Sequence, residues 1–225
     1  MTAAMETIQL GLDEVAQRPI DRTELRLLVP ATLSTHWLMP LLPQIEQADL
    51  GFRLRVHATH TGEDWLSLPH DMAIRRDGFV PPGYRQDLLF QEELAAYANP
   101  TLIRGAGREI LKDVPLLESR TRPGELDRWL AACDVRETNG TRQSFGHFYT
   151  AYQAALTGDG ILIASTLVAA EDVRNGRLAV LEPSMRIHGA RHILLWRKAD
   201  EAATPLVALA AWLKQQFHSP PLTAI

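Results

Sequence analysis

Residues 145–165 read FGHFYTAYQAALTGDGILIAS, and their order decides the fold class of the chain. An aromatic and polar opening leads into a short helix of small residues, which Gly158 and Gly160 end. The wholly apolar run of residues 161–164 follows at once, as expected of a buried strand. A short helix that passes directly into a buried strand is typical of α/β packing.

Strand and helix patterns alternate on both sides of this segment. Period-2 or apolar runs predict strands over residues 24–30, 51–60, 70–78, 114–120 and 191–198. Helical spacing predicts helices over residues 5–17, 35–48, 124–133, 167–176 and 204–217. The helix that begins at residue 35 is expected to be irregular at its start, because Pro40 and Pro43 remove backbone donors and crowd the preceding turn. The alternation favours an α/β fold with largely parallel sheets.

The strands fall into two blocks, residues 24–99 and 101–192, each the size of a small lobe. The last strand and the terminal helix are expected to return to the first lobe. This arrangement predicts a cleft that strand ends and helix starts face, which is where open α/β proteins bind their ligands.

The composition excludes several classes of protein. A formal net charge of -4 offers no basic field for nucleic acid. The single cysteine, Cys133, excludes an internal disulfide and a CxxC metal site, which fits a reducing compartment. Residues 1–19 lack the basic and apolar regions of a signal peptide, and no run approaches the roughly 18 apolar residues of a membrane span. We therefore expect a cytoplasmic protein that does not contact the membrane.

The sequence contains no catalytic motif of a common class. It has no G-x-S-x-G elbow, P-loop, G-x-G-x-x-G fingerprint or H-E-x-x-H pair. His57 and His60 are better explained as surface histidines than as metal ligands, and Cys133 is better explained as a buried, inert thiol than as a nucleophile. We predict no catalytic residue, no metal site and no cofactor.

Polar residues gather instead where the first strand ends and where the helix of the 145–165 segment begins. The candidates are Thr32, Ser34, Thr35, Arg75 and Arg76 in the first lobe, and Gly146, His147 and Phe148 in the second. Hydroxyls and free backbone N–H groups at such places can hold a carboxylate or a similar anion, or they can simply cap a helix. The two arginines are either clamps for a ligand or solvated charges.

Four stretches, in this order and spacing, resemble the effector-binding domain of LysR-type transcriptional regulators, in particular the branch of the glycine-cleavage and β-lactamase regulators. They are LRLLVPATLSTHWLMPLLPQIEQ (25–47), HDMAIRRDG (70–78), LLFQEELAAYANPTLI (88–103) and FGHFYTAYQAALTGDGILIASTLVAAEDVRNGRLAVL (145–181). Each motif is loose by itself, but the four together span about residues 24–217.

The resemblance implies the type 2 periplasmic-binding-protein fold, in which two Rossmann-like lobes are joined by two crossover strands, here near residues 94–98 and 193–196. The implied division is residues 1–22 as the remnant of a linker helix and connector, 23–99 plus 193–225 as lobe I, and 100–192 as lobe II. The 145–165 segment would then lie beside the ligand cleft, and its small residues would permit close helix packing in a dimer.

The implied function is effector sensing and oligomerisation. A small metabolite, for which a carboxylate-bearing compound is one candidate, would bind in the cleft and alter the DNA-bound state of the regulator. The residues predicted to bind it are Ala31, Thr32, Leu33, Ser34, Arg76, Tyr97, Gly146, His147, Phe148 and Trp196. The resemblance also implies a homodimer, in which residues 37–47 of one subunit meet residues 149–156 of the other, and a tetramer of the full-length regulator.

This sequence departs from the family in ways that affect the prediction. It shows no winged helix-turn-helix, so we expect DNA binding only through a domain absent from these residues. His147 replaces the usual asparagine, and Pro30 and Ala31 stand where other members often have glycine. Two rival functions stay open: a free-standing solute-binding protein of the same fold, and an enzyme on this scaffold.

Overall fold

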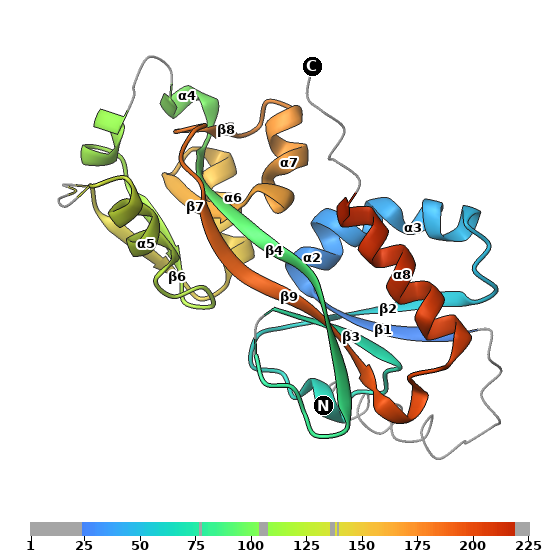
Figure 1. Ribbon diagram of the computed structural model, residues 1–225. Coiled ribbons are helices and arrows are strands. Elements are labelled where there is room, and N and C mark those ends of the chain that lie inside the picture. Colours follow the sequence, from blue (N-terminus) through green and yellow to red (C-terminus); the bar gives the residue numbers. More distant parts are fainter. Residues whose placement is uncertain (1–23, 77, 104–107, 136–137, 139, 219–225) are drawn as a thin grey trace, which may run out of the picture. The chain divides into compact units, whose positions relative to one another are not determined.

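The computed structural model describes residues 24–76, 78–103, 108–135, 138 and 140–218 (Figure 1). The contacts of this chain divide it into two compact units. Within the described residues, unit 1 comprises residues 24–34, 38–90 and 191–218, and unit 2 comprises residues 35–37 and 91–190. The helix expected over residues 5–17 lies outside the described residues.

The part of the sheet that lies in unit 1 has the strand order β2-β1-β3-β9-β4. β1 (Glu24–Pro30) lies between β2 (Arg53–Thr59) and β3 (Met72–Arg76), and both neighbours run parallel to it. β9 (Ile187–Arg197) pairs antiparallel with β3. Leu27 lies opposite Val56 on one side and Met72 on the other, and its side chain is buried, as expected for the central strand of such a sheet.

The helix after β1 is irregular at its start, which confirms the sequence prediction. α2 (Ala31–Leu33) passes into the π-helical turn η1 (Ser34–Leu38) before the regular helix α3 (Met39–Gln47) begins. Pro40 and Pro43 lie just beyond the π turn, where neither can donate to the preceding turn. α8 (Thr204–His218) completes unit 1. Its buried side chains are Leu206, Leu209, Ala210 and Leu213.

The sheet of unit 2 mixes both strand directions. β4 (Tyr84–Ala98), which begins in unit 1, pairs antiparallel with β7 (Ile161–Ser165). β5 (Leu116–Ser119) follows, parallel to both β7 and β6 (Arg142–Phe145). The short strand β8 (Ala179–Val180) pairs antiparallel with the far end of β4. The expectation of largely parallel sheets therefore holds only for β1–β2–β3 and β7–β5–β6.

Helices cover the sheet of unit 2. They are α5 (Glu125–Ala132), α6 (Phe148–Thr157) and α7 (Thr166–Arg174). Short elements elsewhere in the described residues are η2 (Trp65–Ser67), α4 (Pro100–Ile103), η3 (Arg108–Lys112) and η4 (Lys198–Asp200). α6 ends at Gly158, whose φ of 91° is the left-handed conformation that glycine adopts at helix ends. No described helix is long and apolar enough to cross a membrane.

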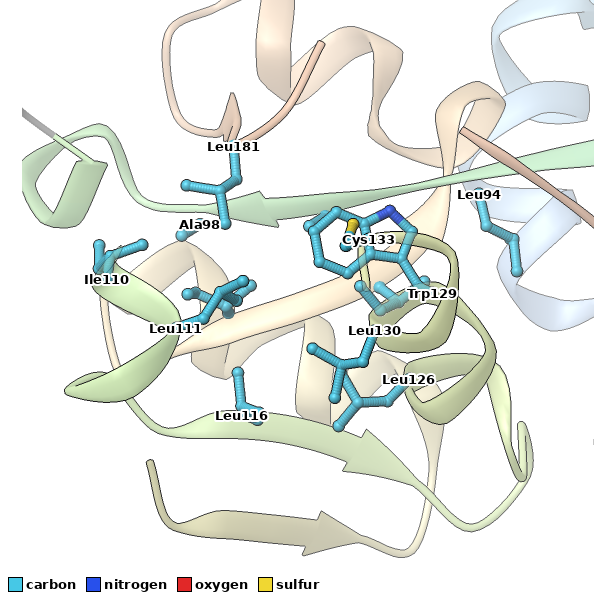
Figure 2. Close-up of a cluster of buried hydrophobic side chains, with 13 residues drawn as sticks. Leu94, Ala98, Ile110, Leu111, Leu116, Leu126, Trp129, Leu130, Cys133 and Leu181 are labelled. Carbon is cyan, nitrogen blue, oxygen red and sulfur yellow. The ribbon is translucent and has the colours of Figure 1, made fainter. Parts of the chain in front are cut away.

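Two hydrophobic clusters, one against each face of this sheet, stabilise unit 2. Figure 2 shows the first, in which Trp129 and Leu130 of α5 pack beside Leu116 of β5 and Leu94 of β4. The second contains residues of α6 and α7 with Ala95 and Tyr97 of β4. The alternation of β4 side chains between the two clusters follows from the period of two along a strand. Cys133 is buried in the first cluster, as the sequence indicated.

The chain passes from unit 1 to unit 2 between Phe90 and Gln91, and it returns between Ala190 and Arg191. Both passages lie inside long strands, β4 and β9, so no turn signal marks them in the sequence. The division expected from the sequence puts its limits after residues 99 and 192.

Candidate functional site

A cavity of about 280 Å³ lies wholly within unit 2. It is found where β5 and β6 end and where α5 and α6 begin, which is the edge at which α/β sheets hold their ligands. Its lining residues are Leu117, Glu118, Ser119, Arg120, Arg122, Pro123, Gly124, Glu125, Leu126, Asp127, Arg142, Ser144, Phe148, Leu162 and Ile163.

The turn after β5 presents two arginines to the cavity. The amide of Arg122 donates to the carbonyl of Ser119 at 2.9 Å, and the amide of Arg120 donates to the carbonyl of Phe145 at 2.9 Å. The hydroxyls of Ser119 and Thr121 lie 2.8 Å apart. These bonds hold the turn in one conformation, so that both guanidinium groups start from fixed backbone positions.

Arg122 is the buried cation of the cavity. Its side chain is only 8% exposed, and its guanidinium lies 3.6 Å from the centre of the Phe148 ring. Carboxylate oxygens of Glu92 and Glu125 lie 3.8 and 4.0 Å from its Nη1 atom. A buried charge is tolerated only with such opposite charges nearby, so this cluster fixes Arg122 in the wall of the cavity.

Arg142 bridges two acidic residues at the other side of the cavity. Its Nη1 donates to Glu118 at 2.8 Å, and its Nη2 donates to Asp127 at 2.7 Å. The hydrogen bond to Asp127 raises the pKa of Arg142 above its ordinary value. Both acidic groups therefore share one cation of the protein, Arg142, which balances one of their two negative charges.

Arg120 differs from Arg122 and Arg142 in its surroundings. Among the residues that the structure describes, no carboxylate lies within ion-pair distance of its guanidinium, and the side chain is exposed. A Cβ atom at Gly146 would lie 3.2 Å from Arg120 Nη2, so the absence of a side chain there leaves room for this group. Gly146 directly precedes His147, the N-cap residue of α6, whose first turn contains no acidic residue. The start of α6 beside Arg120 therefore contributes a positive partial charge, while Glu118, Glu125 and Asp127 bring negative charge to the same cavity.

The predicted residues of unit 1 lie near the ends of its parallel strands. Ala31, Thr32, Leu33 and Ser34 follow β1 directly, and Leu33 and Ser34 are buried. Arg76 ends β3. Trp196 is buried in β9, with the guanidinium of Arg85 lying 5.1 Å from its ring.

Hydrogen bonds bear on two alternatives that the sequence left open. Neither Pro30, the N-cap of α2, nor His147, the N-cap of α6, makes a side-chain capping hydrogen bond. Arg75 is more than a solvated charge, because its Nη1 donates to the buried Thr59 hydroxyl at 3.2 Å and its guanidinium lies 5.3 Å from the Trp65 ring.

In unit 2 the structure brings part of the predicted set together. Phe148 lines the cavity, and Gly146 lies beside Arg120. Tyr97 packs in the same buried cluster as Phe148, and burial raises its pKa to about 12. Tyr97 is thus a core residue, and it does not line the cavity. His147 is exposed at the start of α6.

Sequence reasoning missed the arginines of this cavity. The run ESRTRPGE, residues 118–125, places two arginines directly after an apolar strand, which was the available signal. Arg142 and Ser144 were missed because β6 has no apolar run, and three of its four residues are exposed.

Two α/β units that two long strands connect are the architecture of the type 2 periplasmic-binding-protein fold, as predicted. The model of the LysR substrate binding domain matches residues 20–218, and the chain belongs to that family.

The relatives of this chain are transcriptional regulators. The HTH-type transcriptional regulator TrpI of Pseudomonas aeruginosa is 28% identical over 206 residues, covering 84% of this chain and 66% of that protein. The glycine cleavage system transcriptional activator of Escherichia coli (strain K12) is 28% identical over 153 residues, covering 65% of this chain and 50% of that protein. This chain thus spans about half to two thirds of the length of these relatives.

Solved structures agree with this fold. The AmpR effector binding domain from Citrobacter freundii superposes with a TM-score of 0.74 at 20% identity, covering 87% of this chain and 98% of that one. The effector domain of AmpR of Pseudomonas aeruginosa gives a TM-score of 0.73. These findings favour a domain of a LysR-type regulator, and they overturn the alternative of a free-standing solute-binding protein.

Proposed function

We propose that this domain senses a small metabolite for a LysR-type transcriptional regulator. The observation that carries the proposal is the family match over residues 20–218, and the cavity of unit 2 supports it. A metabolite that binds one arrangement of the domain more tightly than another shifts the population toward the first. That difference in affinity is what would couple the metabolite to the DNA-bound state.

The residues predicted from the sequence are the proposed effector contacts of each unit, and Phe148 among them lines the cavity of unit 2. In unit 1 these are residues 31–34 and Arg76, and in unit 2 they are Gly146, His147 and Phe148. Tyr97 and Trp196 are buried and would act by shaping the site. The domain works as a homodimer, and as a tetramer in the complete regulator, which contacts DNA through a separate helix-turn-helix domain. The regulator acts in the cytoplasm, and the domain binds its metabolite without converting it.

A thermal-shift screen tests this function. The chain is heated with amino acids, aromatic and short-chain carboxylates, and peptidoglycan fragments. A specific effector raises the melting temperature with saturation, because binding to the native state alone stabilises it by about 2.7 kcal/mol at a hundredfold excess over Kd.

Two variants and two matched controls locate the effect. Thr32→Ala and His147→Ala should weaken the shift, whereas Thr204→Ala and His188→Ala, at exposed positions outside the proposed site, should retain it. An equal shift in all four variants would show that the site is misplaced. A screen in which no compound raises the melting temperature would contradict the sensing function itself.

A further inference from the structure

The three arginines that line the cavity of unit 2 differ in their acidic neighbours. Arg142 is bound to Glu118 and Asp127, and Arg122 lies against Phe148, Glu92 and Glu125. Among the described residues, Arg120 is the cavity-lining arginine for which the structure gives no carboxylate within 4.0 Å. A guanidinium group presents its donors in a planar fork that matches the paired oxygens of a carboxylate or a phosphate.

We propose that Arg120 binds the anionic group of the effector at the mouth of this cavity, and that the group is a carboxylate or a phosphate. The inference rests on the proposed function and names the chemistry of its ligand. Arg120 belongs to a turn that three hydrogen-bonding contacts hold, so its approach to an anion is directed by the backbone. The hydroxyl of Ser144, also on the cavity wall, is available as a further donor.

The neighbouring residues define the remainder of this subsite. Gly146 provides space for the Arg120 guanidinium, because a Cβ atom there would lie 3.2 Å from Nη2. Arg122 is a positioning residue: it keeps Phe148, the first residue of α6, against the cavity wall through the 3.6 Å contact with its ring. The first N–H groups of α6 have no partner within the helix, and their partial positive charge favours an anion near Gly146 and Arg120.

The test uses the whole chain labelled with ¹⁵N and three probes: acetate, benzoate and inorganic phosphate. Each probe is titrated against sodium chloride at equal ionic strength, and the amide shifts of residues 119–122 and 144–148 are followed. The proteins are wild type, Arg120→Gln, Arg120→Lys and, as a matched control, Arg174→Gln, which removes an exposed arginine of α7 outside the cavity.

We expect saturable shifts at these residues with at least one probe in wild type and in Arg174→Gln. Loss of a charged hydrogen-bonding partner should weaken binding about 10- to 100-fold in Arg120→Gln. Arg120→Lys should lie between the two, because lysine keeps the charge and loses the fork. Melting temperatures should be equal in all four proteins, since both positions are exposed.

Three results would overturn the inference: shifts that are equal in Arg120→Gln and wild type, shifts confined to other parts of the chain, or no saturable shift with any probe. The proposed function fails separately. An uncharged metabolite that Arg120→Gln binds as tightly as wild type would leave the sensing function intact and remove the anion subsite. If a probe anion binds through Arg120 but no metabolite stabilises the chain, the anion subsite stands and the sensing function fails.

Discussion

Single residues show how unit 2 tolerates a buried carboxylate. Asp172 of α7 is almost fully buried, and its Oδ2 accepts a hydrogen bond from the hydroxyl of Tyr152 at 2.5 Å. Its Oδ1 lies 2.6 Å from Arg177 Nε, which comes from the turn after the helix. Burial, and then the bond to Asp172, raises the pKa of Tyr152, so the phenol remains a donor. These contacts join α6, α7 and the turn that leads to β8.

Replacing Tyr152 with phenylalanine should therefore destabilise the protein. The change removes a hydrogen bond to a charged, buried group, and we expect the free energy of unfolding to fall by about 1.5–3 kcal/mol. Urea unfolding followed by circular dichroism measures the loss. The control is Tyr149→Phe, because Tyr149 lies on the same helix and is 60% exposed. Equal unfolding free energies for the two variants would mean that the Asp172 contact contributes nothing.

The protonation of His70 in unit 1 is expected to affect the stability of the fold. It packs against Trp65 and Tyr84, its Nε2 lies 3.0 Å from the Tyr84 hydroxyl, and its Nδ1 lies 2.7 Å from the Leu68 carbonyl oxygen. Burial is the main cause that lowers the pKa of His70 below its ordinary value of 6.5, and the charge of Arg197 acts in the same direction. The Leu68 carbonyl and Asp71 oppose this shift without reversing it.

The pH dependence of stability follows from that direction. Because the folded pKa lies below the unfolded one, the unfolded state binds more protons as the pH falls below about 6.5. The stability that neutral His70 provides is complete above this pH and is lost as the pH falls through the folded pKa. We expect His70→Gln to show a weaker decline in unfolding free energy between neutral and mildly acidic pH than wild type. Parallel curves for the two proteins would exclude His70 as the titrating group.

Whole elements were predictable from the sequence where one face or both faces are buried. The helix α6, the strand β7 and the π-distorted start of α3 follow from apolar spacing, the two glycines and the two prolines. β6 was missed because it buries no residue. Strand direction in unit 2 was only partly predicted, since it depends on which strands become neighbours. The proximity of Arg120 to Gly146 could not be predicted, because it depends on the pairing of β5 with β6.

The junction between α6 and β7 offers a test of close packing. A Cβ atom at Gly160 would lie 2.4 Å from the carbonyl oxygen of Pro115, the residue before β5, so the start of β7 would have to move. We expect Gly160→Ala to lower the free energy of unfolding by about 1–3 kcal/mol. In Gly146→Ala the new atom meets only the end of an exposed side chain, and the change should stay within about 0.5 kcal/mol. Chemical denaturation of both variants gives the comparison, and similar losses would contradict the packing argument.

The complete molecule is proposed to act as a dimer, and its exposed apolar side chains allow a test. Met39 of α3 is 40% exposed and Tyr149 of α6 is 60% exposed, on the two segments proposed to meet between subunits. We expect Tyr149→Glu to shift the chain toward monomer, because a carboxylate would lose its hydration in an apolar interface. Sedimentation velocity over a range of concentrations measures this shift. Val173→Glu, at an exposed apolar position on α7, should sediment as wild type; if Tyr149→Glu does so too, the proposed interface is wrong.

The passage of β4 and β9 between the units has a consequence for synthesis on the ribosome. Residues 91–190 of unit 2 are continuous, so that block is fully translated once Ala190 has emerged. The sheet of unit 1 then still lacks the part of β9 from Arg191 onward, and α8 is also still missing. Until they arrive, β3 presents an unpaired edge to its surroundings, the kind of edge that recruits other chains. The later-encoded unit can therefore fold first, and the nascent chain needs protection at β3 for as long as translation of the last segment takes.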